Sequence, residues 1–267
     1  MSVPTPFWRS VETLNNFVYL VPEAGRHYAS IGLKGSWMGY FASRAAPMGA
    51  ASPELVVATF HGFAPHLVHR ALPDAWGFAT PAEVHRARLE LATDVLGLAV
   101  SGEQVAPLAD ALAEIIEGLD LAGKPLAAAH ASVEVPADDL GRFWVADAVL
   151  REFRGDCHVA VLVTEGLGGV DANVLNVAAG RTFPQQQALR GWSDDEWAAG
   201  HDRLRERGWL DADGAITPLG TQVRDGLEDA TDRACLAAMS ADARARATEI
   251  TDAMRDVARA LRASLKA

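Results

Sequence analysis

The sequence predicts a mainly α-helical protein with one short β-hairpin in its last third. Proline, glycine and helix-capping residues divide the 267 residues into helix-length blocks, and alternating runs of β-branched residues are almost absent. An Asp-Gly pair between short apolar segments, Asp213-Gly214, is typical of a tight hairpin turn. A chain of this length can bury a large core without disulfides or a structural metal.

Three helices are indicated in the first part of the chain. Ser52-Pro53-Glu54 and Thr80-Pro81-Ala82-Glu83 each place a hydroxyl cap before a proline and an acidic residue, and Glu83 completes a capping box. The second start predicts a helix of about 20 residues. Between the two starts, Pro65 and Pro73 bracket a shorter helix.

A further helix begins at Asp138 or Asp139, either of which can act as its cap. We expect it to run to about Arg154 and to end at Gly155, with Asp156 as the cap of the next helix. Two helices would therefore meet within residues 151–158.

The last third has a different pattern. Ser193-Asp194-Asp195-Glu196 is a capping box, and the helix that it opens should end at Arg207-Gly208. The predicted hairpin spans residues 209–216, and Thr217-Pro218 starts another helix. Helix, glycine, hairpin and helix in this order are typical of a winged helix.

Residues 240–267 predict one long amphipathic helix, because apolar side chains recur at helical spacing. This apolar stripe consists of Ile250, Met254, Val257, Leu261 and Leu265. Since such a stripe must pack on something, it favours a homodimer. The predicted organisation is a helical ligand-binding domain at 1–168, a winged-helix-like module at 169–239 and this C-terminal helix.

Composition restricts the location and the partners of the protein. Cys157 and Cys235 lie far apart in the sequence, which favours a reducing compartment and argues against a thiolate metal cluster. The sequence lacks a secretory signal and any long apolar run, so we expect a cytoplasmic protein that does not enter membranes. The net charge of −11 opposes binding to nucleic acid.

Residues 202–210, with the sequence DRLRERGWL, resemble the recognition helix and wing of MarR-type regulators. Together with residues 40–49, 151–158, 191–193 and 230–233, they resemble an actinobacterial family of helical proteins with a MarR-like C-terminal module. The resemblance implies a helical domain followed by a winged-helix-like module, and it implies no particular activity.

The predicted module is too acidic for a typical DNA reader. Between Gln185 and Arg233 there are eleven acidic residues, six arginines and no lysine. Asp194, Asp195 and Glu196 would lie at the start of the reader helix, where a helix enters the major groove. Because DNA affinity depends strongly on contacts to phosphates, we expect the module not to bind DNA.

The strongest candidate for chemistry lies at residues 151–158, where Arg151, Glu152 and His158 are close in sequence. His130, among small residues, could pair with His158. A neutral imidazole suits proton transfer, so we predict His158 or His130 as general base and Glu152 as the residue that orients it. Ion-pair networks also produce such clusters, and a purely structural role stays open.

A second candidate wall combines aromatic, hydroxyl and cationic groups. Tyr40, Arg44 and Met48 precede or form the turn at Pro47-Met48-Gly49, and their composition is that of a ligand pocket. We predict Tyr40, Arg44, Met48 and Arg151 as ligand-binding residues, with an arginine holding an anionic group. These side chains could equally belong to a helix end and the core.

The sequence identifies no cofactor, and binding of a divalent metal ion or haem is the weakest of the hypotheses that it supports. His66 and His69 are three residues apart on one helix and His61 precedes them, so these histidines could supply ligands. The sequence contains no HExxH, GxxxxGK or GxSxG motif and no GxGxxG after a strand, so no cofactor is implied by a motif.

The sequence therefore supports three hypotheses for the function. The preferred one is a small-molecule-binding helical protein, more an enzyme of specialised metabolism than a carrier, that uses His, Glu and Arg for acid–base chemistry. The second is a ligand-sensing, MarR-like transcriptional regulator. The third is a protein that binds metal or haem through His61, His66 and His69.

Overall fold

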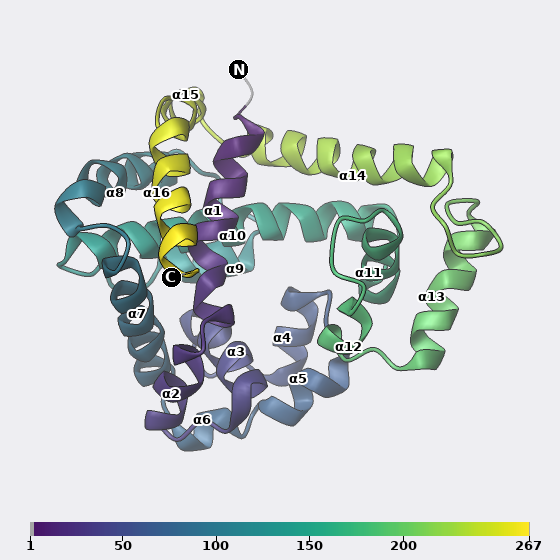
Figure 1. Ribbon diagram of the computed structural model, residues 1–267, viewed down its shortest axis with the longest axis horizontal. Coiled ribbons are helices and arrows are strands. Elements are labelled where there is room, and N and C mark those ends of the chain that lie inside the picture. Colours follow the sequence, from purple (N-terminus) through teal and green to yellow (C-terminus); the bar gives the residue numbers. More distant parts are fainter. Residues whose placement is uncertain (1–2, 267) are drawn as a thin grey trace. The chain divides into compact units, whose positions relative to one another are not determined.

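The computed structural model describes residues 3–266 and confirms the mainly α-helical fold: in these residues the regular structure is helical and no sheet forms (Figure 1). No helix of this range has the length and apolar character needed to cross a membrane. The chain divides into two compact units, each built from separate segments of sequence.

Unit 1 comprises Met1–Ala51, Leu72–Asp156 and Cys235–Ala267. Its helices are α1 (Thr5–Leu20), α2 (Glu23–Ser30), α3 (Gly35–Ala45), the 3-10 helix η1 (Ala46–Met48), α6 (Ala75–Phe78), α7 (Pro81–Gly97), α8 (Gly102–Glu117), α9 (Pro125–Ala131), most of α10 (Asp139–Thr164), α15 (Ala241–Glu249) and α16 (Thr251–Ser264). α2, α3 and η1 pack against α7, α15 packs against α8, and α1 lies beside α16 (Figure 1).

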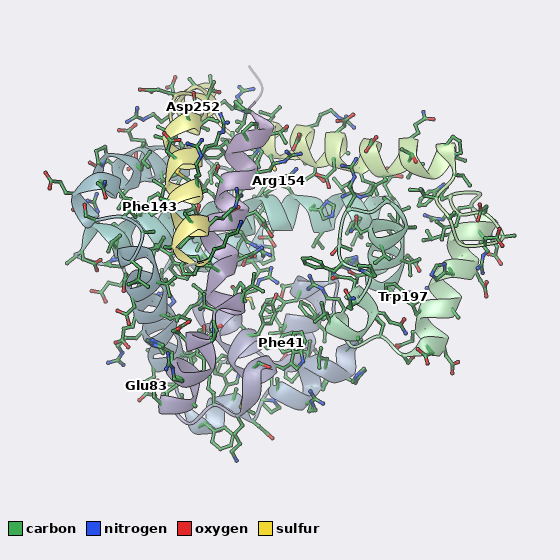
Figure 2. The ribbon with its side chains drawn as sticks, in the orientation of Figure 1. Phe41, Glu83, Phe143, Arg154, Trp197 and Asp252 are labelled. Atoms are coloured by element: carbon green, nitrogen blue, oxygen red, sulfur yellow. The ribbon has the colours of Figure 1, made fainter. Side chains whose placement is uncertain are left out.

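Unit 2 comprises Ser52–Ala71 and Cys157–Ala234. It contains α4 (Pro53–Phe60), α5 (Pro65–Ala71), the end of α10, α11 (Gly169–Ala178), α12 (Gln186–Arg190), α13 (Asp194–Glu206) and most of α14 (Pro218–Ala237). α11 packs against α13, and Leu175 and Leu204 lie in its apolar core. Trp197, on α13, packs at the edge of this core (Figure 2).

The predicted helix starts are confirmed by their caps. Ser52 accepts a hydrogen bond from the backbone of Leu55 at the start of α4. Thr80 and Ser193 form complete capping boxes with Glu83 and Glu196 at α7 and α13. These short-range signals succeed because the cap and the backbone groups that it satisfies lie within one turn of each other.

The predicted break at Gly155 is wrong, because α10 continues through it to Thr164. A glycine inside a helix costs about 1 kcal/mol relative to alanine, and the burial of Phe153 and Cys157 on either side more than offsets this cost. Asp156 does not cap its own helix; its Oδ2 accepts a hydrogen bond from the backbone N–H of Ala127 in the first turn of α9, at 2.9 Å.

The predicted β-hairpin is not formed. Leu210 and Ile216 make a single antiparallel bridge, and no strands extend from it. The Asp211 side chain accepts from the backbone N–H groups of Asp213 and Ala215, so the segment closes on itself as a turn. Because this turn takes up residues 211–215, the pairing next to it is limited to the bridge between Leu210 and Ile216.

The predicted long C-terminal helix is two helices, α15 and α16, which meet at Ile250. The predicted apolar stripe is largely buried within the chain: Met254 and Leu261 are 0% exposed, whereas Leu265 is 45% exposed. Because α16 packs on α1, the stripe no longer supports a homodimer, which stays a prediction without this argument.

Two domain boundaries, after residues 168 and 239, were expected from the change in sequence pattern. The two compact units describe packing and use different segments, since each unit draws on both the N-terminal and the C-terminal parts of the chain. The domain boundaries stay a prediction.

Candidate functional site

The centre of the candidate site is a buried ion pair between α3 and α10. Arg44 donates from Nε and Nη2 to the two carboxylate oxygens of Glu152, at 2.8 and 2.7 Å. Arg151 donates to the same carboxylate at 3.0 Å, and Arg44 also donates to the Tyr40 hydroxyl at 3.4 Å. The structure thus brings together four residues that the sequence analysis selected on two separate segments.

Glu152 is fixed as an anion by this arrangement. Its side chain is 0% exposed, and burial alone would raise the pKa of its carboxyl. Arg151 and Arg44 outweigh burial and hold that pKa well below its usual range. Glu152 therefore orients two guanidinium groups in this structure. Its role in orienting a catalytic histidine stays a prediction.

A second group of polar side chains surrounds Arg88 on α7. Arg88 is fully buried and donates to the Ser43 carbonyl, at 3.4 Å, and to the Tyr19 hydroxyl. Its Nη1 also lies 3.1 Å from Nε2 of His130 on α9. The guanidinium carbon lies 4.8 Å from the ring centre of Trp144, as a cation–π contact.

The hydrogen bonds of His130 define its tautomer. Nδ1 lies 2.9 Å from the Leu126 carbonyl, which can only accept, so Nδ1 carries the proton and Nε2 accepts from Arg88. Burial lowers the pKa of His130 to about 3, with a further lowering by Arg88, so the ring is neutral at pH 7. In this geometry the lone pair that a general base needs is directed at a guanidinium.

We call these seven side chains the arginine network: Tyr19, Tyr40, Arg44, Arg88, His130, Arg151 and Glu152. They come from α1, α3, α7, α9 and α10, all within unit 1. Tyr19 and Tyr40 are partly exposed and stack edge to face, with ring centres 4.7 Å apart. Arg151 is 17% exposed, so the network reaches the surface at three of its members.

Asp156 lies one turn after Glu152 on α10. Burial raises the pKa of its carboxyl to about 6, although the hydrogen bond from the Ala127 backbone lowers it. A carboxyl that titrates near neutral pH can accept and return a proton. Asp156 therefore has a property expected of an acid–base group, although the sequence analysis assigned it only a cap.

His158, the other predicted general base, lies in unit 2. Its Nδ1 is 2.9 Å from Thr231 Oγ1, and Thr231 donates its hydroxyl to the Leu227 carbonyl at 2.8 Å. Because that hydroxyl proton is used, Nδ1 of His158 donates to Thr231. Its pairing with His130, which belongs to unit 1, stays a prediction.

The other residues of the predicted site have separate surroundings. Met48 is partly buried in η1, which packs against α7 and α9. Arg154, between Arg151 and His158 in sequence, places its guanidinium 5.9 Å from the ring centre of Trp8. Phe41, which is 0% exposed, extends the aromatic group around Tyr40 (Figure 2).

The three histidines predicted as metal or haem ligands do not form a cluster. The side chain of His61 lies with Nε2 3.1 Å from the Leu167 carbonyl, and burial lowers its pKa. His66 and His69 are exposed on α5. In residues 3–266, no three histidine, cysteine or acidic side chains converge in a way that could hold a metal ion.

Two members of the network, Tyr19 and Arg88, were not predicted. Arg88 had a detectable signal: it lies on the apolar face of α7, four residues after Val84 and three before Leu91, both of which are 0% exposed. A charged residue at a core position of an amphipathic helix is rare unless it is paired or functional. Tyr19 gave no comparable signal, because its partner is distant in sequence.

Comparison with known proteins identifies the family of the chain. A family model described as a helix-turn-helix family matches residues 5–266. The chain belongs to this helix-turn-helix family. No curated protein and no solved structure matches it.

The charges of this helix-turn-helix protein are distributed unevenly in α13 and the turn after it. Asp194, Asp195 and Glu196 are exposed in the first turn of α13, and Asp211 and Asp213 are exposed in the turn that follows it. The side chain of Glu196 accepts hydrogen bonds from Ser193, which lower its pKa. The segment that would enter the major groove in a DNA-binding winged helix is thus acidic at its surface.

Five arginines from α12, α13, α14 and the end of α13 contact other groups of unit 2. Their contacts are Arg203 with Asp171, Arg205 with Asp202, Arg207 with the Glu165 carbonyl, Arg224 with Glu228, and Arg190 over the Phe63 ring. A guanidinium that already has a carboxylate partner gains less from a phosphate, because the existing ion pair must first be broken.

Proposed function

We propose that this helix-turn-helix protein binds a small organic molecule at the arginine network of unit 1. The observation that carries the proposal is the network itself, in which five helices place seven polar side chains in and around the core. Buried ion pairs contribute little to stability compared with apolar residues of similar size. Their concentration at one place that reaches the surface supports a functional role.

Proton transfer is the chemistry that we propose for the site, which would make the protein an enzyme. Asp156, with a pKa raised by burial to about 6, supports this proposal, and His158 and His130 stay the histidines predicted for it. Specialised metabolism as the source of the ligand rests on the resemblance to actinobacterial proteins with a MarR-like module.

Ligand binding can be tested by thermal denaturation in the presence of a library of small organic molecules. A molecule that binds the folded protein should raise Tm in a concentration-dependent way. Tyr40→Phe removes one hydroxyl from the network and should weaken binding about tenfold, which corresponds to about 1.4 kcal/mol.

The matched control is Thr93→Val, because the Thr93 hydroxyl bonds only to carbonyl groups within α7. This variant should bind the molecule with unchanged affinity. If Tyr40→Phe and Thr93→Val have equal affinities for every ligand found, the network is not the binding site.

A ligand-sensing regulator is the second candidate, favoured by membership of a helix-turn-helix family. In that case the same network would bind the effector and unit 2 would bind DNA. The exposed acids of α13 and the internal contacts of its arginines support the first proposal over this one.

A further inference from the structure

Arg88 differs from the other two arginines of the network in lacking an acidic partner. Arg44 pairs with Glu152, and Arg151 lies 3.6 Å from Glu12 in addition to its contact with Glu152. In residues 3–266, no carboxylate lies within ion-pair distance of Arg88.

The groups that do contact Arg88 are neutral. The Ser43 carbonyl has no charge, His130 is held as the neutral Nδ1–H tautomer, and burial raises the pKa of the Tyr19 hydroxyl. The Trp144 ring offers only its face to the cation. Hydrogen bonds therefore satisfy part of the guanidinium, while no carboxylate contacts it directly.

The Nε–H of Arg88 has no hydrogen-bond acceptor, although it is fully buried. A buried donor without a partner is unfavourable, and a buried charge without a counter-charge is more so. An anion next to Arg88 would remove both penalties, since it would accept from Nε and neutralise the guanidinium.

We infer that Arg88 binds the carboxylate of the small molecule whose binding is proposed above, and that this ligand is a monoanion. This inference rests on the proposed function. A single negative charge matches the one guanidinium that lacks a carboxylate, and carboxylates are the acceptors that guanidinium groups bind most directly. The aromatic rings of Tyr19 and Trp144 beside Arg88 suit an apolar or aromatic body.

The inference separates the roles of the three arginines. Arg44 and Arg151 are both held by Glu152, whereas Arg88 supplies the charge that the ligand uses. Tyr19 connects Arg88 to the exposed side of the network, because its hydroxyl contacts Arg88 and its ring is partly exposed.

The test compares acids with their uncharged amides. Tm of the full chain is measured with increasing acetate, acetamide, benzoate and benzamide at constant ionic strength. We expect the two carboxylates to raise Tm in a saturable way, with benzoate the stronger, and the amides to have at least tenfold weaker effects.

Arg88→Met removes the charge while keeping a long side chain. It should abolish the response to carboxylates, and without any ligand we expect a lower Tm, because the Ser43 carbonyl and Nε2 of His130 lose their donor. Arg26→Met, on the exposed side of α2, is the control and should respond like the natural protein.

A second measurement keeps the test independent of how Arg88→Met folds. In ¹⁵N NMR spectra, the Nε–H resonance of Arg88 is identified as the one that disappears in Arg88→Lys. Benzoate should shift this resonance in the natural protein, because the Nε–H of Arg88 gains an acceptor. Equal binding of acids and amides, or an unmoved resonance on benzoate binding, overturns the inference and leaves the proposed function standing. If neither these probes nor any library molecule binds, both fail.

Discussion

At the scale of single residues, the interior of unit 1 contains polar groups that an ordinary core would avoid. Asp147 on α10 is 0% exposed, and neither of its carboxylate oxygens has a hydrogen-bond partner. Burial raises the pKa of this carboxyl well above its usual range, and Glu12 raises it further. The folded protein thus favours a proton on Asp147 that the unfolded chain would release at neutral pH.

The stability of the protein should therefore depend on pH through Asp147. A raised folded-state pKa stabilises the fold below the unfolded pKa of about 4, and this contribution is lost as pH rises towards the folded-state pKa. We expect Asp147→Asn to raise Tm at pH 8, on the order of 2–5 °C, and to have little effect at pH 4. Thermal denaturation across this pH range measures the difference.

The control for this prediction is Asp252→Asn, since Asp252 is exposed at the start of α16 (Figure 2). It should change Tm little at either pH. An equal loss of stability in Asp147→Asn at pH 4 and at pH 8 would contradict the assignment of a buried carboxyl that the fold keeps protonated.

At the scale of helices, local signals in the sequence were reliable and long-range ones were not. The caps at Ser52, Thr80 and Ser193 could be predicted because each is completed within four residues. Gly155 and Asp156 matched a helix end equally well, and only the position of Ala127, from a distant helix, shows what Asp156 caps. The pairing of Arg44 with Glu152 likewise depends on contacts over 108 residues of sequence.

The crossing of α2 and α3 gives a test at this scale. A Cβ at Gly39 on α3 would lie 2.5 Å from Cδ2 of the buried Tyr28 on α2. We expect Gly39→Ala to lower the free energy of unfolding by about 1–3 kcal/mol, because Tyr28 must move in a packed core. Chemical denaturation of the variant measures this change.

Gly25→Ala is the matched substitution on α2, where a Cβ would meet nothing within 4 Å. It should stabilise the protein by about 0.5–1 kcal/mol, since alanine favours the helix more than glycine does. If both variants lose stability equally, close packing at Gly39 is not the cause.

At the scale of the whole molecule, charge decides between the two proposed functions. The net charge is −11, and the exposed start of α13 is acidic. Phosphate contacts provide most of the affinity for DNA, and that affinity falls steeply with salt. We therefore expect that the protein causes no gel shift of the DNA upstream of its own gene, even at low salt.

A charge-reversed variant, Asp194→Lys combined with Asp195→Lys, is the comparison for this experiment. It should bind DNA weakly, without sequence preference and only at low salt. A sequence-specific shift by the natural protein at about 150 mM salt would favour the regulator and contradict the first proposal.

The division of the chain into discontinuous units restricts how it can be taken apart. Unit 2 uses 52–71 and 157–234, so no single cut in the sequence releases either unit whole. A fragment that ends at residue 168 would lose α16 and leave the apolar face of α1 in water. Joining the two ends would still leave each unit in two segments, so even a circularly permuted chain could not be cut into the two units. The proposed ligand binding of unit 1 can therefore be separated from unit 2 only by point substitutions.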